Sequence, residues 1–117
     1  PNTIETLKET AHIGKNFLYT HRGKSVFCYL KEYGIYDCFT DFITSEDGFP
    51  PKPAPDAVEY FLKKYSLKKD ETVMIGDREI DVLSGKNAGT YGCLFTKEKK
   101  ETAADFVIDD IKKILDI

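Results

Sequence analysis

The chain has 117 residues, a length that suits one compact domain, and its hydrophobic (41%) and charged (32%) fractions are ordinary for a globular protein. Its 17 basic and 20 acidic residues give a net charge of −3 and are scattered along the sequence, which argues against a nucleic-acid partner. No apolar stretch approaches the roughly 20 residues of a membrane helix, and no secretory pattern opens the chain. We therefore expect a cytoplasmic protein, without a membrane partner, that forms one domain over residues 1–117.

The three cysteines are Cys28, Cys38 and Cys93. They are odd in number, widely spaced and free of any Cys-x-x-Cys pairing, which argues against both a disulfide framework and a zinc site. We expect reduced thiols that are mostly buried.

Four elements are predicted in the first part of the chain from apolar residues at helical spacing and from short apolar runs. They are a helix that ends near residue 14, a strand at 16–19, a helix from about 24 to 33 and a strand at 42–44. Gly34 supplies the C-terminal stop of the second helix. The segment 45–53 is rich in Gly and Pro, which predicts a loop without regular structure.

The second part of the chain continues the alternation of helices and strands. The predicted elements are a helix at 56–65, a strand at 72–75, a helix at 79–87, strands at 91–95 and 106–108, and a terminal helix at 109–115. Strands and helices that alternate at this rhythm predict a doubly wound, Rossmann-like α/β fold, in which helices cover both faces of a parallel sheet. The mixed-charge run at 97–101 is interpreted as a solvated turn or helix face rather than a binding patch.

Two aspartates stand where the strand at 72–75 meets the following helix. Gly76 precedes Asp77 and allows a sharp bend or a close approach to a ligand, and Asp81 follows one helical turn later. Two carboxylates that face one small volume suit a hard divalent cation. Taken alone, however, the pair is better explained by a helix cap and a first-turn acid.

Polar residues also follow two other predicted strands. Thr20 ends the strand at 16–19, and Lys52 lies in the loop after the strand at 42–44. Each is unremarkable singly, because Thr20 could cap a helix and Lys52 could be an exposed lysine. Together with Asp77 they describe a phosphate site, in which a hydroxyl donates, a lysine neutralises charge and carboxylates hold Mg²⁺. Phosphoryl transfer needs mainly positioning and charge neutralisation, which these groups supply.

The ordered motifs Thr20, Lys52-Pro53 and Gly76-Asp77 to Asp81 resemble those of the haloacid dehalogenase (HAD) superfamily, in particular its phosphoglycolate phosphatase-like branch. The resemblance covers essentially the whole chain. It implies the C-terminal portion of a HAD hydrolase core domain, and a magnesium-dependent phosphatase that acts on a small phosphorylated metabolite through an aspartyl-phosphate intermediate.

The resemblance also implies a role for each motif residue. The Thr20 hydroxyl and the His21 amide would bind the phosphoryl group, and Lys52 would steady the charge of nucleophile and phosphate. Thr20 and Lys52 are therefore the catalytic candidates. Asp77 would be a direct Mg²⁺ ligand, and Asp81 would bind the metal through water or orient its ligands.

The family's nucleophile motif, Asp-x-Asp after a hydrophobic strand, does not occur in these 117 residues. In the family that strand lies centrally, between the strands that here end at Thr20 and Asp77, and a cap usually follows it. Without it, two strands would expose unpaired backbone groups in the core. We therefore expect a missing N-terminal segment or a completing chain, and no turnover from the 117 residues alone.

Two other functions stay open. A catalytically inactive HAD-like remnant would bind phosphate or metal without the nucleophile. A receiver-like signalling domain shares the doubly wound sheet but is weaker, because its acids and lysine come in a different order. The substrate, the cap type and the oligomeric state cannot be read from the sequence.

Overall fold

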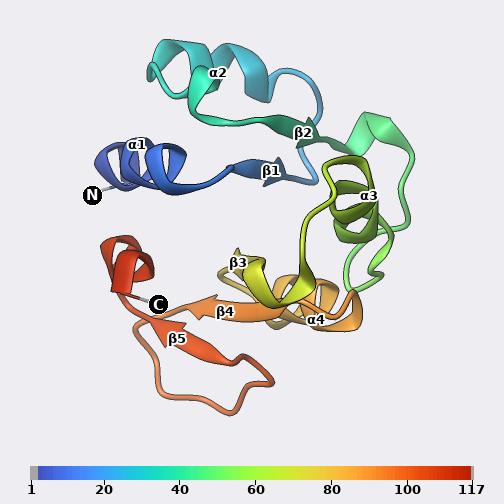
Figure 1. The fold of residues 1–117 in the computed structure, drawn as a ribbon, viewed down its shortest axis with the longest axis vertical. Coiled ribbons are helices and arrows are strands. Elements are labelled where there is room, and N and C mark those ends of the chain that lie inside the picture. Colours follow the sequence, from blue (N-terminus) through green and yellow to red (C-terminus); the bar gives the residue numbers. More distant parts are fainter. Residues whose placement is uncertain (1–2, 117) are drawn as a thin grey trace. The chain divides into compact units, whose positions relative to one another are not determined.

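The computed structural model describes residues 3–116, which fall into two compact units. Unit 1 comprises residues 3–48 and 111–116, and unit 2 comprises residues 49–110. Each unit contains its own parallel sheet with helices (Figure 1). The parallel α/β class predicted from the sequence is confirmed, whereas the single domain over 1–117 stays a prediction.

Unit 1 is built around a sheet of two parallel strands. Its elements are α1 (Thr3–Ile13), β1 (Phe17–Tyr19), α2 (Val26–Glu32), β2 (Asp41–Ile43) and the 3₁₀ helices η1 (Tyr36–Cys38), η2 (Ser45–Asp47) and η4 (Ile111–Asp116). In the β1–β2 pair, Leu18 lies opposite Phe42. Gly34 follows α2 with a φ of 70°, the left-handed conformation that ends many helices, as the sequence predicts.

The core of unit 1 consists of Val26, Leu30 and Ile35, with a group of aromatic rings packed against it. Phe42 of β2 lies at the centre of these rings, with centroids 5.1 Å from Phe27 and 5.0 Å from Tyr36. Such aromatic contacts add to the burial of apolar surface. They hold α2 and η1 against β2, the strand that pairs with β1.

Unit 2 contains a parallel sheet of three strands in the order β3-β4-β5. Its elements are α3 (Asp56–Lys64), the 3₁₀ helix η3 (Lys69–Glu71), β3 (Val73–Gly76), α4 (Glu79–Asn87), β4 (Tyr91–Phe95) and β5 (Phe106–Ile108). The helix α4 packs on β3 and β4 (Figure 1). Val82 on this helix and Leu94 on β4 are completely buried. Within residues 3–116 no helix combines the length and apolarity needed to cross a bilayer.

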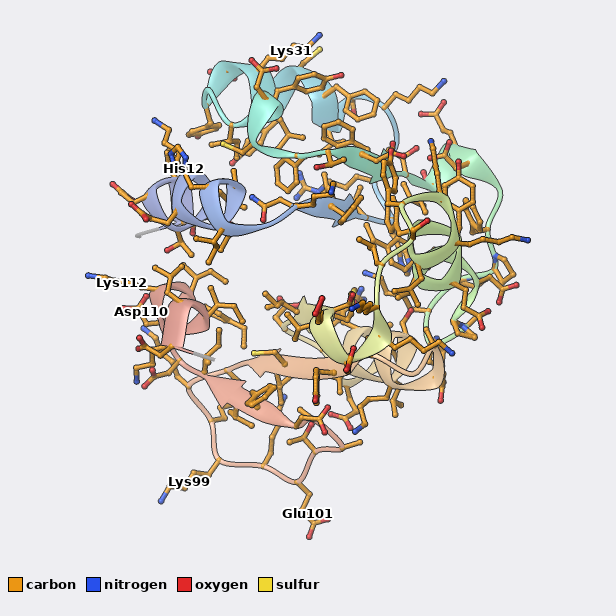
Figure 2. The ribbon with its side chains drawn as sticks, viewed as in Figure 1. His12, Lys31, Lys99, Glu101, Asp110 and Lys112 are labelled. Atoms are coloured by element: carbon orange, nitrogen blue, oxygen red, sulfur yellow. The ribbon has the colours of Figure 1, made fainter. Side chains whose placement is uncertain are left out.

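A long connection joins β4 to β5 and extends away from the sheet (Figure 1). It carries the mixed-charge run 97–101, all of whose residues are exposed, as expected from the sequence. Figure 2 shows Lys99 and Glu101 pointing away from the rest of unit 2.

Two predicted segments differ from the structure. The predicted helix at 109–115 is instead η4, a 3₁₀ helix of six residues, a form that is common in short pieces. The segment 45–53 is mostly loop but begins with η2. There the Thr44 hydroxyl accepts the amide of Glu46, and the Thr44 amide donates to Asp47 Oδ2 at 2.7 Å.

The strands that lead to Thr20 and Asp77 each have one strand partner among the described residues. β1 pairs with β2, and β3 pairs with β4. Each therefore has an edge to which another strand could add. A strand that completes these edges stays a prediction.

The cysteines are more exposed than expected. Cys93 is buried, but Cys38 is only half-buried and Cys28 is exposed. Cys28 lies on the outward side of the short helix α2, whose buried residues are Val26 and Leu30, so the expectation of mostly buried thiols is wrong for it. Burial raises the pKa of the Cys93 thiol, which keeps it protonated and unreactive.

Candidate functional site

A buried ion pair joins two of the predicted site residues in unit 2. Lys52 Nζ lies 2.8 Å from Asp81 Oδ1, and both side chains are only 6% exposed. Ionised groups at this depth are rare unless they are paired, because removing a charge from water costs several kcal/mol. Two residues that are 29 positions apart in the sequence, one in a loop and one in α4, thus meet as a compact charge pair.

The end of β3 is shaped to accommodate Asp81. A Cβ at Gly76 would lie 2.5 Å from both Cγ and Oδ2 of Asp81, so only glycine leaves room for the carboxylate over the strand end. Asp81 Oδ2 accepts the backbone N–H of Arg78 at 3.2 Å, which fixes the carboxylate at the first turn of α4. The Arg78 guanidinium adds a weaker charge contact, 3.7 Å from Oδ1, and is itself largely exposed. This geometry explains the glycine that the sequence places before Asp77.

The two aspartates differ in their surroundings. Asp77 is exposed directly after β3, whereas Asp81 is buried. Within the described residues Oδ1 of Asp81 has the Lys52 amine 2.8 Å away as its ion-pair partner and no other donor within hydrogen-bond distance. Its lone pairs are therefore not fully used.

These carboxylates have the chemistry of a magnesium site. Mg²⁺ takes oxygen ligands, keeps several waters and is commonly bound by one or two carboxylates together with substrate phosphates. Asp77 and Asp81 offer that set, and the underused Asp81 Oδ1 fits it. Residues 3–116 contain no group of three or more His, Cys, Asp or Glu side chains that could hold a metal. A cation here would thus complete its coordination with water or phosphate oxygens.

Two side chains of α4 bind the loop that carries Lys52. The Ser84 hydroxyl donates to the carbonyl of Ala54 at 2.9 Å, and the Asn87 side-chain amide donates to the carbonyl of Pro53 at 3.1 Å. The sequence reasoning missed both residues. The one signal in the sequence is that Asp81, Ser84 and Asn87 follow one another at three-residue intervals, so that successive members are neighbours on the helix surface.

Glu79 and Asp105 fasten the connection between β4 and β5 to α4. Glu79 accepts the amide of Ala103 at 2.8 Å and the hydroxyl of Thr102 at 2.5 Å, and these bonds lower the pKa of the Glu79 carboxyl below its usual range. Asp105 pairs with Lys86 at 2.9 Å, and this contact lowers the pKa of Asp105 in the same way. The helix that carries Asp81 is thus also attached to the connection between β4 and β5.

The predicted phosphate-binding residues Thr20 and His21 belong to unit 1, where they follow β1. Thr20 donates its backbone N–H to Ile43 on β2, and its hydroxyl accepts the amide of Arg22 at 3.1 Å, which leaves the hydroxyl proton for another acceptor. The amide of His21 has no hydrogen bond among residues 3–116, and its side chain is exposed. Both groups have the donor capacity that a phosphoryl oxygen requires.

The loop after Thr20 is held by η2. The Arg22 carbonyl accepts the amide of Ser45 at 3.0 Å, and Glu46 Oε2 accepts the amide of Lys24 at 2.6 Å. A Cβ at Gly23 would lie 2.8 Å from the same Glu46 oxygen, so a larger residue there would displace the Glu46 carboxylate. The sequence reasoning missed Glu46, whose contact joins residues 22 positions apart.

Residues 1–94 match the family model described as haloacid dehalogenase-like hydrolase. The chain belongs to this family. The chain is similar to a phosphoglycolate phosphatase of Vibrio vulnificus (strain CMCP6), 33% identical, and to a glyceraldehyde 3-phosphate phosphatase of Methanocaldococcus jannaschii, 31% identical. Each alignment covers 100% of this chain and 55% of the relative. The chain therefore spans about half the length of these curated relatives.

The fold agrees with solved HAD structures. The NMR structure of a core domain from Streptococcus pneumoniae TIGR4 superposes with a TM-score of 0.80 at 34% identity, over 99% of this chain and 86% of that chain. The resemblance inferred from Thr20, Lys52 and the Gly76-Asp77 junction is thus confirmed at the level of family and fold. The roles of the individual residues stay predictions.

Proposed function

We propose that this chain is the phosphate- and metal-binding portion of a magnesium-dependent phosphatase that hydrolyses a phosphate monoester of a small metabolite. Its membership of the HAD hydrolase family supports the hydrolase class, and two relatives that are named phosphatases support the choice of phosphate ester. We expect a cytoplasmic enzyme, in keeping with such a substrate.

The buried Lys52–Asp81 pair is the observation that carries the proposal. A lysine amine at 2.8 Å from a carboxylate, with both groups 6% exposed, concentrates a cation and an anion at the carboxyl end of a parallel strand. Ligands of open α/β sheets bind at that end. The exposed Asp77 beside it adds a second carboxylate. A bound phosphate would complement the charge of the Lys52 amine, and a divalent cation would complement the charges of the two carboxylates.

Each residue would have a distinct role. Lys52 would neutralise phosphoryl oxygens, while the Thr20 hydroxyl and the His21 amide would donate hydrogen bonds to them. Asp77 and Asp81 would hold Mg²⁺, which when bound supplies positive charge to the phosphoryl oxygens. Such positioning and charge neutralisation are most of what phosphoryl transfer needs.

The nucleophile would come from residues outside these 117, since no Asp-x-Asp occurs among them. A carboxylate oxygen would attack phosphorus, the bond from phosphorus to the alcohol oxygen would break, and that oxygen would take a proton. Water would then hydrolyse the acyl phosphate, which returns the carboxylate and releases inorganic phosphate. We call the protein that joins these residues to the nucleophile segment the complete enzyme.

The lack of an Asp-x-Asp motif in these 117 residues also favours one alternative, an inactive module that binds phosphate or metal. The two functions differ in a simple observation. An Asp-x-Asp segment in the same open reading frame supports the enzyme, and a reading frame without it supports the module.

Substitution of Asp77 tests the proposal. In the complete enzyme, Asp77→Asn should lower magnesium-dependent hydrolysis of para-nitrophenyl phosphate by about 10²-fold or more, because the neutral amide loses the charge that attracts the cation. Asp70→Asn is the matched control, since Asp70 is an exposed aspartate in η3 of the same unit. Both variants should melt close to the parent. Parent-like turnover in Asp77→Asn would contradict the assignment.

A further inference from the structure

We propose that Ser84 and Asn87 are positioning residues for the Lys52 amine. With Asp81 they form a row on one side of α4, which we call the 81-84-87 row. The inference rests on the proposed function, because it concerns how the phosphate-binding lysine is held in place.

The 81-84-87 row meets the Lys52 loop at three consecutive residues. Residues three positions apart on a helix are neighbours on its surface, so the row presents one carboxylate, one hydroxyl and one amide to a common strip. Asp81 pairs with the Lys52 amine at 2.8 Å. Ser84 binds the carbonyl of Ala54 at 2.9 Å, and Asn87 binds that of Pro53 at 3.1 Å. Both the side chain of Lys52 and the backbone that follows it are therefore attached to one helix.

The loop depends on these side chains because its own backbone has few donors. Positions 51, 53 and 55 are prolines, which have no N–H. The carbonyls of residues 53 and 54 instead accept donors from α4. Ser84 is completely buried, and Ala54 supplies the partner that a buried hydroxyl requires.

The placement of the loop determines where the lysine amine lies. Lys52 has a flexible four-carbon stem, so its Nζ is fixed only if the backbone at its base is fixed. Loss of either bond releases a carbonyl immediately after Lys52 and lets the loop shift. A displacement of about 1 Å can cost an enzyme up to about 10²-fold in rate.

Three variants of the complete enzyme test the inference on para-nitrophenyl phosphate. Ser84→Ala and Asn87→Asp should each lower kcat/KM by about 10-fold or more, because neither new side chain donates to the loop at neutral pH. Asn87 is exposed, so its variants should fold. Asn87→Gln keeps the amide donor and should retain most of the parent kcat/KM.

Thr90→Val is the matched control. It removes a buried hydroxyl that donates to the carbonyl of Gly85 at 3.0 Å, in the same unit but away from the Lys52 loop. We expect Thr90→Val to lower the Tm about as much as Ser84→Ala and to leave kcat/KM unchanged. If Ser84→Ala and Asn87→Asp also keep the kcat/KM of the control, the inference is overturned.

A coupling measurement separates positioning from general stability. Ser84→Ala should weaken the binding of inorganic phosphate, but should weaken it no further in a Lys52→Ala background, because both changes act through the same amine. Additive losses would overturn the inference. Parent-like turnover of Lys52→Ala would instead overturn the proposed function, so the two failures are distinguishable.

Discussion

Replacement of Lys52 by methionine should destabilise the protein by about 3 kcal/mol or more. Two unit charges 2.8 Å apart attract each other by about 6 kcal/mol at an effective dielectric constant of about 20, and desolvation offsets most of this energy. The net value of the intact pair is therefore small. Its one-sided removal is costly, about 3–5 kcal/mol, because it leaves the Asp81 carboxylate buried and unpaired.

The exposed pair Lys86–Asp105 provides a matched control in the same unit. Its N–O distance is 2.9 Å, almost that of the buried pair, but its side chains are 34% and 29% exposed. Lys86→Met should therefore cost about 1 kcal/mol or less, because water screens the charges. The difference between the two methionine variants isolates the effect of burial.

The assay is urea unfolding of the complete enzyme, followed by circular dichroism. Lys52→Met should lower the midpoint of unfolding clearly more than Lys86→Met. Addition of Asp81→Leu to Lys52→Met should restore part of the stability, because no unpaired charge then remains. Equal midpoints for Lys52→Met and Lys86→Met would refute the conclusion that burial makes the loss of the Lys52–Asp81 pair costly.

Two further predictions concern neighbours of Asp81 on β3 and α4. Gly76→Ala should cost about 1–3 kcal/mol and lower turnover, because its Cβ would press on the Asp81 carboxylate at 2.5 Å. In Gly14→Ala the nearest atom to the new Cβ is 3.9 Å away, so this control should change neither quantity, and an equal loss in both variants would contradict the steric argument. Glu79→Gln should be less stable than the parent at neutral pH, because the folded state lowers the pKa of Glu79. That advantage is present above the ordinary pKa near 4.3 and is lost as the pH falls through the lower folded pKa. The unfolding midpoints of the two proteins should therefore converge as the pH falls below that ordinary value, and a constant difference would contradict the prediction.

The regular elements with clear local signals could be predicted from the sequence. The helix 79–87 and the strands 91–95 and 106–108 match the structure at both ends. Their ends lie close to residues that favour the end of a helix or strand by their own backbone preference. One example is Gly89, which adopts a φ of 88° two residues after α4. The short 3₁₀ helices were missed or mistaken for an α-helix, because three to six residues carry no periodic pattern.

The candidate site was only partly predictable for a different reason. Thr20 and Asp77 directly follow the short apolar strands β1 and β3, which the sequence signals locally. Lys52 and Asp81 meet within unit 2 as an ion pair. Ser84 and Asn87 contact carbonyls 30 and 34 positions away, and any residue can supply a carbonyl. The three-residue spacing relates these side chains to Asp81 but does not identify the carbonyls that they bind. Chemically ordinary residues that hold the loop in place could therefore be recognised only from the structure.

The dependence of turnover on metal tests the central claim most directly. Hydrolysis of para-nitrophenyl phosphate by the complete enzyme should stop when a chelator removes divalent cations, and Mg²⁺ should restore it, because the carboxylates of Asp77 and Asp81 would otherwise repel the phosphoryl group. Turnover that persists undiminished in the chelator, or that is absent even with Mg²⁺, would contradict a magnesium-dependent phosphoryl-transfer site.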